Sequence, residues 1–153
     1  MTDSIRKRAV FDTNVFLAAH LTQNPNSPTA ELLSRWANNE FDILYCDQLL
    51  DEVREKFADR GIIQEPADEF IDDLRNMGIR VEITSDDIVQ VIAADPDDDV
   101  IIACAVKGGA THIVTYDSHF EFLSGQYRGI KIMGGLHFLY EVRGDVARSI
   151  KGA

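Results

Sequence analysis

The sequence is poor in cysteine and in long apolar runs. Its two cysteines, Cys46 and Cys104, lie in apolar surroundings and fit no metal-ligand spacing, so we expect buried free thiols rather than disulfides or a cysteine-bound metal. No apolar run approaches the roughly 20 residues that cross a bilayer, and the N-terminal stretch has basic residues but no signal-peptide core. These absences exclude a disulfide scaffold and a membrane-spanning protein, and they predict a cytoplasmic location.

Positive charge is also scarce. The chain has 15 Lys and Arg against 26 Asp and Glu, a net charge of -11. This net negative charge repels a nucleic acid, so the protein's overall electrostatic field does not favour binding it. An acidic surface favours basic partners, a bound metal or simple solubility. Any contact with nucleic acid should therefore be local and assisted by a metal ion.

Several catalytic motifs are missing as well. The chain has no GxxxxGK[ST] phosphate loop, no convincing order of serine, histidine and acid, and no cysteine nucleophile in a basic setting. These absences argue against nucleotide hydrolysis on a phosphate loop and against the common forms of nucleophilic catalysis.

What the chain does contain is a regular alternation of strand and helix patterns, with no internal repeat or linker. The patterns predict strands at 9–11, 41–46, 79–83, 112–115 and 130–133, and helices from 15, from 28 to about 38, at 48–58, 67–77, 86–93, 100–106 and 136–142, with a helical turn at 118–123. Such alternation predicts a three-layer α/β/α sandwich with a mostly parallel central sheet. We expect one domain over residues 1–142 and a polar tail over 143–153.

The most informative stretch runs from Asp95 to Asp117. Four carboxylates in five positions lead into an apolar helix, a Gly-Gly break and a strand that ends in a further acid. A helix N-terminus and the carboxyl end of a strand can open on the same edge of a parallel sheet, so Asp99 and Asp117 can converge there. Carboxylates from different elements are the oxygen ligands that Mg²⁺ prefers.

Two earlier acids extend this group. Asp12 follows the first strand, although an isolated aspartate there is more simply a helix cap. Glu52 lies about 100° from Val53 around its helix, at the edge of the apolar face, although a solvated glutamate is the simpler interpretation. Crowded carboxylates are costly unless a cation neutralises them. A metal held there can activate water and stabilise charge on a phosphate, so hydrolysis of a phosphodiester is the reaction that these residues suit best.

The successive motifs resemble those of PIN-domain proteins. They are Val10-Phe11-Asp12-Thr13-Asn14-Val15, Leu49-Leu50-Asp51-Glu52-Val53, Asp95-Pro96-Asp97-Asp98-Asp99 and Ile113-Val114-Thr115-Tyr116-Asp117. The resemblance extends from Val10 to the last helix, and it is strongest to the branch described as the toxin component of toxin-antitoxin pairs. It implies an endoribonuclease that uses Mg²⁺ or Mn²⁺.

Carried over motif by motif, the resemblance implies four catalytic acids: Asp12, Glu52, Asp99 and Asp117. Of these, Asp12, Asp99 and Asp117 would bind the metal, with Asn14 and Thr115 in support. Asp99 stands in the family's place immediately before the apolar helix, and its neighbour Asp98 is the alternative third acid. The four histidines are scattered, so we expect core or surface roles for them. His119, two residues after Asp117, is the one that belongs near the acids.

Other functions fit some of these residues. A haloacid dehalogenase-like phosphatase also begins with a strand ending in aspartate, but its second acid is replaced here by Asn14, which removes the acid/base of that route. A PIN-fold protein that binds a partner without catalysis is a third alternative. For a nuclease, we expect RNA as substrate and a basic antitoxin whose arginine pairs with the acids. Dimerisation through an early helix pair is compatible with such folds, and the sequence leaves it open.

Overall fold

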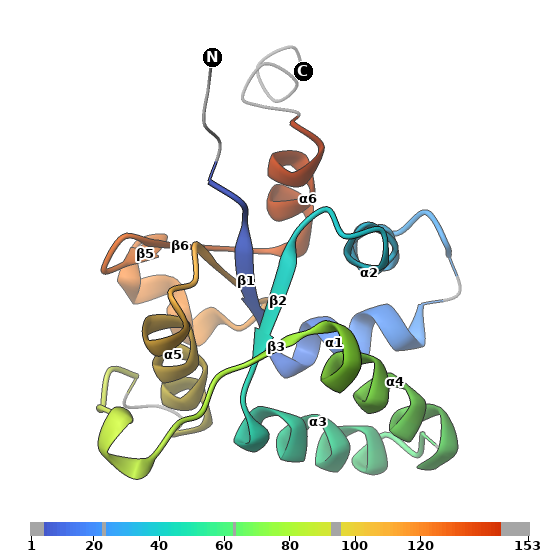
Figure 1. The fold of residues 1–153 in the computed structure, drawn as a ribbon, viewed down its shortest axis with the longest axis horizontal. Coiled ribbons are helices and arrows are strands. Elements are labelled where there is room, and N and C mark those ends of the chain that lie inside the picture. Colours follow the sequence, from blue (N-terminus) through green and yellow to red (C-terminus); the bar gives the residue numbers. More distant parts are fainter. Residues whose placement is uncertain (1–4, 23, 63, 93–95, 145–153) are drawn as a thin grey trace.

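A six-stranded sheet forms the centre of the molecule (Figure 1). The computed structural model describes residues 5–22, 24–62, 64–92 and 96–144. The strand order is β3-β2-β1-β4-β6-β5, and only β5 runs antiparallel to its neighbour. The strands are β1 (Arg8–Phe11), β2 (Asp42–Tyr45), β3 (Ile79–Arg80), β4 (His112–Val114), β5 (Gln126–Tyr127) and β6 (Ile130–Met133). The prediction of a mostly parallel sheet is confirmed.

Within the described residues, six α-helices cover this sheet on both sides. In Figure 1, α5 lies on one side of β1 and β2, and α2 and α6 lie on the other. The helices are α1 (Thr13–Leu21), α2 (Pro28–Ala37), α3 (Asp47–Asp59), α4 (Gln64–Met77), α5 (Pro96–Gly108) and α6 (Gly135–Arg143), with short 3₁₀ turns η1 (Ser85–Asp87) and η2 (Ser118–Leu123). None of these helices is long and apolar enough to cross a membrane.

Local signals explain where several helices begin. Ser27 Oγ accepts a hydrogen bond from the Ala30 amide at 3.2 Å, and Pro28 follows at the first helical position, as the sequence predicts. Helix α3 begins without a side-chain cap. Cys46 occupies the cap position without a side-chain bond, and Asp47 is the first helical residue, paired with Arg80 at 2.7 Å.

Three other boundaries differ from the predicted ones. Helix α4 begins at Gln64, so Pro66 lies in its first turn, and β3 is two residues long instead of five. The helix predicted over 86–93 is wrong: η1 makes one turn and residues 88–92 have no helical structure. The amides of Val91 and Ile92 bind the Asp99 carboxylate instead of helical carbonyls. Ala93 and Asp95, part of the predicted segments, lie outside the described residues, as does the tail from 145.

The buried core fixes the position of the strand ends. Ala9, Val10 and Phe11 of β1 have no exposed surface, because β1 has a strand on each side and helices over both faces. The Phe11 ring packs against those of Phe16 and Phe138 at centroid distances of 5.6 and 5.9 Å. This central strand therefore delivers the next residue in the chain to a fixed point at the carboxyl edge of the sheet.

Candidate metal centre

Asp12 lies at the carboxyl end of β1, buried with 4% of its surface exposed. Its amide donates to Val114 O at 2.9 Å, which joins the ends of β1 and β4. Its Oδ1 accepts a hydrogen bond from the Thr13 amide at 2.7 Å, and its Oδ2 accepts one from Thr115 Oγ1 at 2.8 Å. Asp12 thus caps α1 and also belongs to a polar group at the sheet edge.

Burial raises the pKa of Asp12 above its ordinary value. The hydrogen bonds from Thr115 and Thr13 oppose that shift, the negative charge of Asp117 adds to it, and the positive charge of Lys56 reduces it. A nearby cation would favour the ionised carboxylate for the same reason that Lys56 does. The electrostatics of this corner therefore suit a bound positive charge.

Thr115 joins Asp12 to the next acid. While its hydroxyl donates to Asp12, its Oγ1 accepts a hydrogen bond from the Asp117 amide at 3.0 Å. The Asp117 carboxylate accepts in turn from the His119 amide at 2.9 Å, which caps η2. One hydroxyl therefore holds the residue after β1 and the turn after β4 in a fixed relation.

Two carboxylates and an imidazole converge beside this turn. His119 Nδ1 lies 2.9 Å from Asp98 Oδ2 and 3.2 Å from Asp117 Oδ1. One potential ligand atom from each of these three residues lies within 4.8 Å of the other two. Asp98 is buried, whereas the His119 side chain is 40% exposed, so the group is reachable from solvent. His119, the histidine expected near the acids, does lie among them.

Asp99 faces a different part of the protein. Its Oδ1 accepts hydrogen bonds from the amides of Val91 and Ile92 at 2.9 and 2.7 Å, and 5% of its surface is exposed. Consecutive residues of a helix point about 100° apart, so Asp98 and Asp99 cannot both face Asp117. The structure brings Asp98 to Asp117 and His119, and it turns Asp99 toward the segment that precedes α5.

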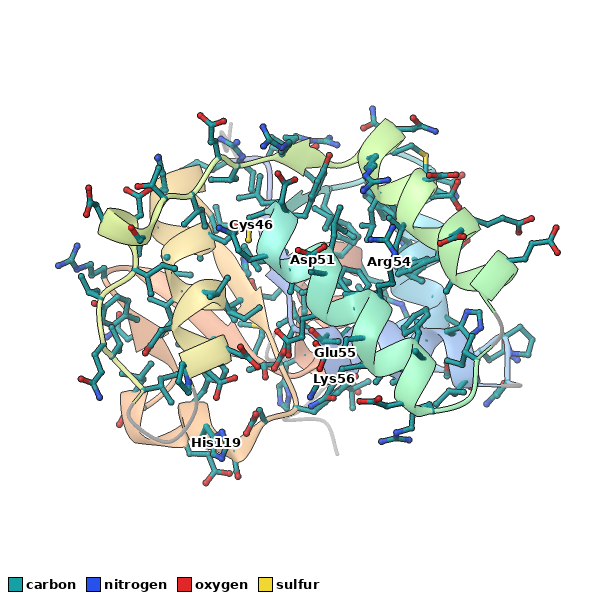
Figure 2. The ribbon with its side chains drawn as sticks, turned by 90° about the horizontal axis from the view of Figure 1, so that it is seen from below. Cys46, Asp51, Arg54, Glu55, Lys56 and His119 are labelled. Atoms are coloured by element: carbon teal, nitrogen blue, oxygen red, sulfur yellow. The ribbon has the colours of Figure 1, made fainter. Side chains whose placement is uncertain are left out.

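The remaining predicted site residues lie at the margin of this group. Glu52 is on α3 with 17% of its side chain exposed, and its Oε1 lies 3.9 Å from Lys56 Nζ. Because Lys56 acts on the charge of Asp12, Glu52 belongs to the same corner without being among the three converging ligands. Asn14 is partly buried in the first turn of α1. Figure 2, viewed toward this edge, shows Lys56 and His119 along the same side of the molecule.

The donor atoms present fit a divalent cation. Carboxylate oxygens are the ligands of Mg²⁺ and Mn²⁺, and an imidazole nitrogen is a ligand for transition metals. Asp98 and Asp117 supply oxygens and His119 supplies a nitrogen, with the Asp12 carboxylate held behind them through Thr115. Each Asp12 oxygen accepts one described hydrogen bond, and an ionised carboxylate has about four lone-pair sites, which leaves capacity for a metal.

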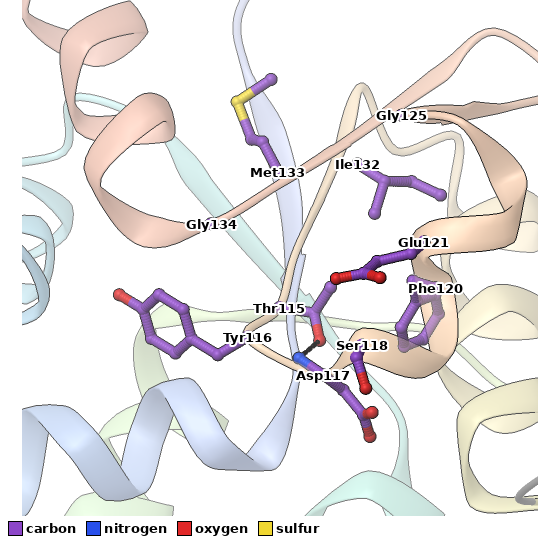
Figure 3. A pocket seen from close by; sticks show the side chains of 10 residues that line it. All are labelled: Thr115, Tyr116, Asp117, Ser118, Phe120, Glu121, Gly125, Ile132, Met133 and Gly134. Carbon is purple, nitrogen blue, oxygen red and sulfur yellow. Dashed lines mark hydrogen bonds between the residues drawn. The ribbon is translucent and has the colours of Figure 1, made fainter.

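A pocket of about 330 Å³ opens next to Asp117 (Figure 3). It lies between the turn after β4, the 3₁₀ turn η2 and the end of β6, and it shares Thr115 and Asp117 with the acidic group. Its floor is a mixture of apolar and polar side chains. The candidate centre therefore has an adjoining cavity large enough for part of a substrate.

The protein is therefore of the α/β class, and its candidate site is a group of acidic residues at the carboxyl edge of a mostly parallel sheet. The model of the PIN domain matches residues 8–119, well over half of the chain. The chain therefore belongs to the PIN-domain family, whose members are generally nucleases, and the resemblance seen in the sequence is confirmed.

Solved structures agree with this fold. The chain is similar to FitAcB from Neisseria gonorrhoeae, with a TM-score of 0.52 and 14% identity over 84% of this chain and 99% of that chain. At that identity the likeness concerns the fold alone. None of the curated proteins matches this chain.

Proposed function

We propose that this protein is a metal-dependent endoribonuclease of the toxin-like PIN branch. The observation that carries the proposal is the convergence of Asp98, Asp117 and His119 within 4.8 Å of one another, beside a buried Asp12 in a chain of the PIN family. The family favours this reading over the dehalogenase-like phosphatase. Mg²⁺ or Mn²⁺ is the proposed cofactor, and the nitrogen of His119 favours Mn²⁺.

Each residue of the centre has a proposed part. Asp98, Asp117, His119 and Asp12 would hold the cation, with Asp98 in the place that the sequence motif gives to Asp99. Thr115 keeps Asp12 and Asp117 in their relative positions through its hydroxyl. When bound, the cation would lower the pKa of a water and stabilise negative charge on the phosphate.

Glu52 and Lys56 of α3 and Asn14 of α1 have further proposed parts. Glu52 is proposed as the acid that orients water or accepts a proton at the rim of the centre, and Asn14 as a supporting polar group. Lys56, 3.9 Å from Glu52, places a positive charge beside the acids. That charge lessens the repulsion between the carboxylates while the cation is absent.

RNA and a basic antitoxin are the proposed partners. With a net charge of -11, the protein has no general attraction for a polyanion, so RNA would bind locally through the cation. The same carboxylates would attract an arginine of an antitoxin segment. Co-expression with the product of a neighbouring gene, followed by size-exclusion chromatography, tests for that complex, and separate elution counts against it.

Cleavage of an RNA panel tests the central proposal. Structured and single-stranded RNAs are incubated with Mn²⁺, with Mg²⁺ and with chelator, using the wild type, Asp12→Asn and Asp98→Asn. Asp97→Asn is the matched control, because it makes the same chemical change at an exposed position of the same helical turn. We expect cleavage that needs metal, Asp12 and Asp98 but not Asp97. A folded, metal-bound protein that cuts no RNA would instead support the non-catalytic alternative.

A further inference from the structure

The pocket beside Asp117 has the form of a small binding site. Its volume of about 330 Å³ is near the lower end of the range of about 300–1,000 Å³ for ligand pockets. Phe120 is buried in its wall, and Ile132 and Met133 of β6 supply further apolar surface. A cavity of this volume suits one small group, such as a base, rather than a segment of folded protein.

Glu121 gives this pocket its polar specificity. Figure 3 shows its carboxylate pointing from η2 into the cavity, whereas the Tyr116 ring on the other side of Thr115 points away toward α6. An ionised carboxylate only accepts hydrogen bonds. The pocket therefore favours an occupant that is apolar on its faces and rich in N–H donors along one edge.

A phosphate is a poor occupant of this cavity. Glu121 projects into it and Asp117 forms part of its wall, so a second anion would be repelled. A neutral base has no such penalty, and RNA-binding proteins commonly hold an unstacked base against side chains while reading its Watson–Crick edge. The shared residues Thr115 and Asp117 place that base next to the centre where a phosphate would react.

We propose that this pocket binds a guanine base of the RNA, adjacent to the phosphate at the metal centre. Guanine presents two neighbouring donors, N1–H and the N2 amino group, which match the two oxygens of Glu121. Adenine and cytosine place a ring acceptor beside their amino donor, and uracil flanks its single donor with two carbonyls. Each of those three edges directs at least one lone pair at the carboxylate.

This inference rests on the proposed nuclease function and adds a substrate preference to it. It also explains how an acidic protein can bind RNA. The base supplies hydrogen bonds and apolar contact, so affinity does not depend on electrostatic attraction between RNA and the protein as a whole. Specificity would then reside in one carboxylate, four residues after the Asp117 metal ligand.

Binding of the four 5′-nucleoside monophosphates measures the preference without cleavage. Calorimetry with Mn²⁺ present compares GMP, AMP, CMP and UMP on the wild type, on Glu121→Gln and on Glu69→Gln. Glu69 is an exposed glutamate of α4 outside the pocket, so it is the matched control. We expect GMP to bind the wild type and the control about tenfold more tightly than the other three nucleotides.

Glu121→Gln should abolish the preference for GMP. A carboxamide offers one acceptor and one donor, and each of the four bases presents a neighbouring donor and acceptor that match it, so GMP should lose its advantage over the other three nucleotides. Glu121 is exposed, so the variant should keep the wild-type melting temperature. Equal binding of all four nucleotides by the wild type, or a guanine preference unchanged in Glu121→Gln, would overturn the proposal.

Mapping of cut sites separates this inference from the function on which it rests. Cuts next to guanine in the wild type, and cuts without base preference in Glu121→Gln, support both. Cuts without base preference in the wild type refute the guanine pocket and leave the nuclease standing. A GMP preference in a protein that cuts no RNA supports the pocket and refutes the nuclease.

Discussion

Replacement of Asp98 and Asp99, one at a time, should separate metal binding from folding. Asp99 accepts hydrogen bonds from two backbone amides at 2.9 and 2.7 Å, and bonds to a charged acceptor contribute about 1.5–3 kcal/mol each. Allowing for non-additivity, Asp99→Ala should cost about 2–4 kcal/mol, because both amides lose their partner. For a chain of this size that corresponds to a fall in melting temperature of roughly 5–15 °C.

Asp98→Asn should weaken metal binding and leave the stability of the metal-free protein nearly unchanged. The change leaves the Asp99 bonds intact and removes one negative charge from the acidic group, so the metal-free melting temperature should move by no more than about 2 °C. The wild type at a hundredfold excess of Mn²⁺ over its Kd should gain about 2.7 kcal/mol, and Asp98→Asn should lose most of that gain.

Differential scanning fluorimetry in chelator and in Mn²⁺ measures both effects on one plate. Asp99→Asn, which keeps a side-chain oxygen, provides an intermediate if the alanine variant is too unstable. Variants of Asp99 should have a lower melting temperature in chelator than the wild type, but Mn²⁺ should raise their melting temperature as much as it raises that of the wild type. The reasoning is refuted if Asp99→Asn abolishes the Mn²⁺ effect and Asp98→Asn retains it, since Asp99 would then be the metal ligand.

Three further outcomes test the packing and the charges. Gly108→Ala should cost about 1–3 kcal/mol in chemical denaturation, because its Cβ would lie 2.7 Å from a Val81 methyl group; an unchanged midpoint would contradict the close approach. Thr115→Val should cost about 1–3 kcal/mol and weaken Mn²⁺ binding in calorimetry, because the Asp12 carboxylate loses its hydroxyl donor; full Mn²⁺ affinity would count against that role. Burial holds the pKa of His112 below its ordinary 6.5, so the unfolded chain binds the proton more readily and stability should fall as pH drops below 6.5, by at most about 1.4 kcal/mol per pH unit. In chemical denaturation, the stability of His112→Gln should not show this part of the decrease at low pH. If the stability of the two proteins changes with pH in the same way, the role given to His112 is wrong.

The sequence was sufficient to predict the elements whose signals are local. Buried runs such as Ala9 to Phe11 mark central strands, and Ser27-Pro28 marks a helix start, because apolar periodicity and capping act over a few residues. The strand ends also placed Asp12 and Asp117 on one edge, since parallel strands leave their carboxyl ends together. These parts of the fold and the site needed no knowledge of distant contacts.

The parts that the sequence did not predict depend on such contacts. The segment 88–92 is not helical, because its amides at Val91 and Ile92 bind a side chain seven to eight residues away. The two-residue strand β5 forms only by pairing with β6. The choice between Asp98 and Asp99 depends on how α5 is rotated about its axis, and counting residues back from a strand cannot supply that angle.

That rotation has a consequence for how the centre can vary. The bonds from Val91 and Ile92 to Asp99 join the segment before α5 to the helical turn that also carries Asp98, the residue that lies beside Asp117 and His119. The orientation of a proposed metal ligand therefore depends in part on a peptide segment that supplies none of the proposed ligands. A substitution that displaces the chain at Ile92 should therefore disturb the proposed metal centre while leaving every proposed ligand residue in the sequence.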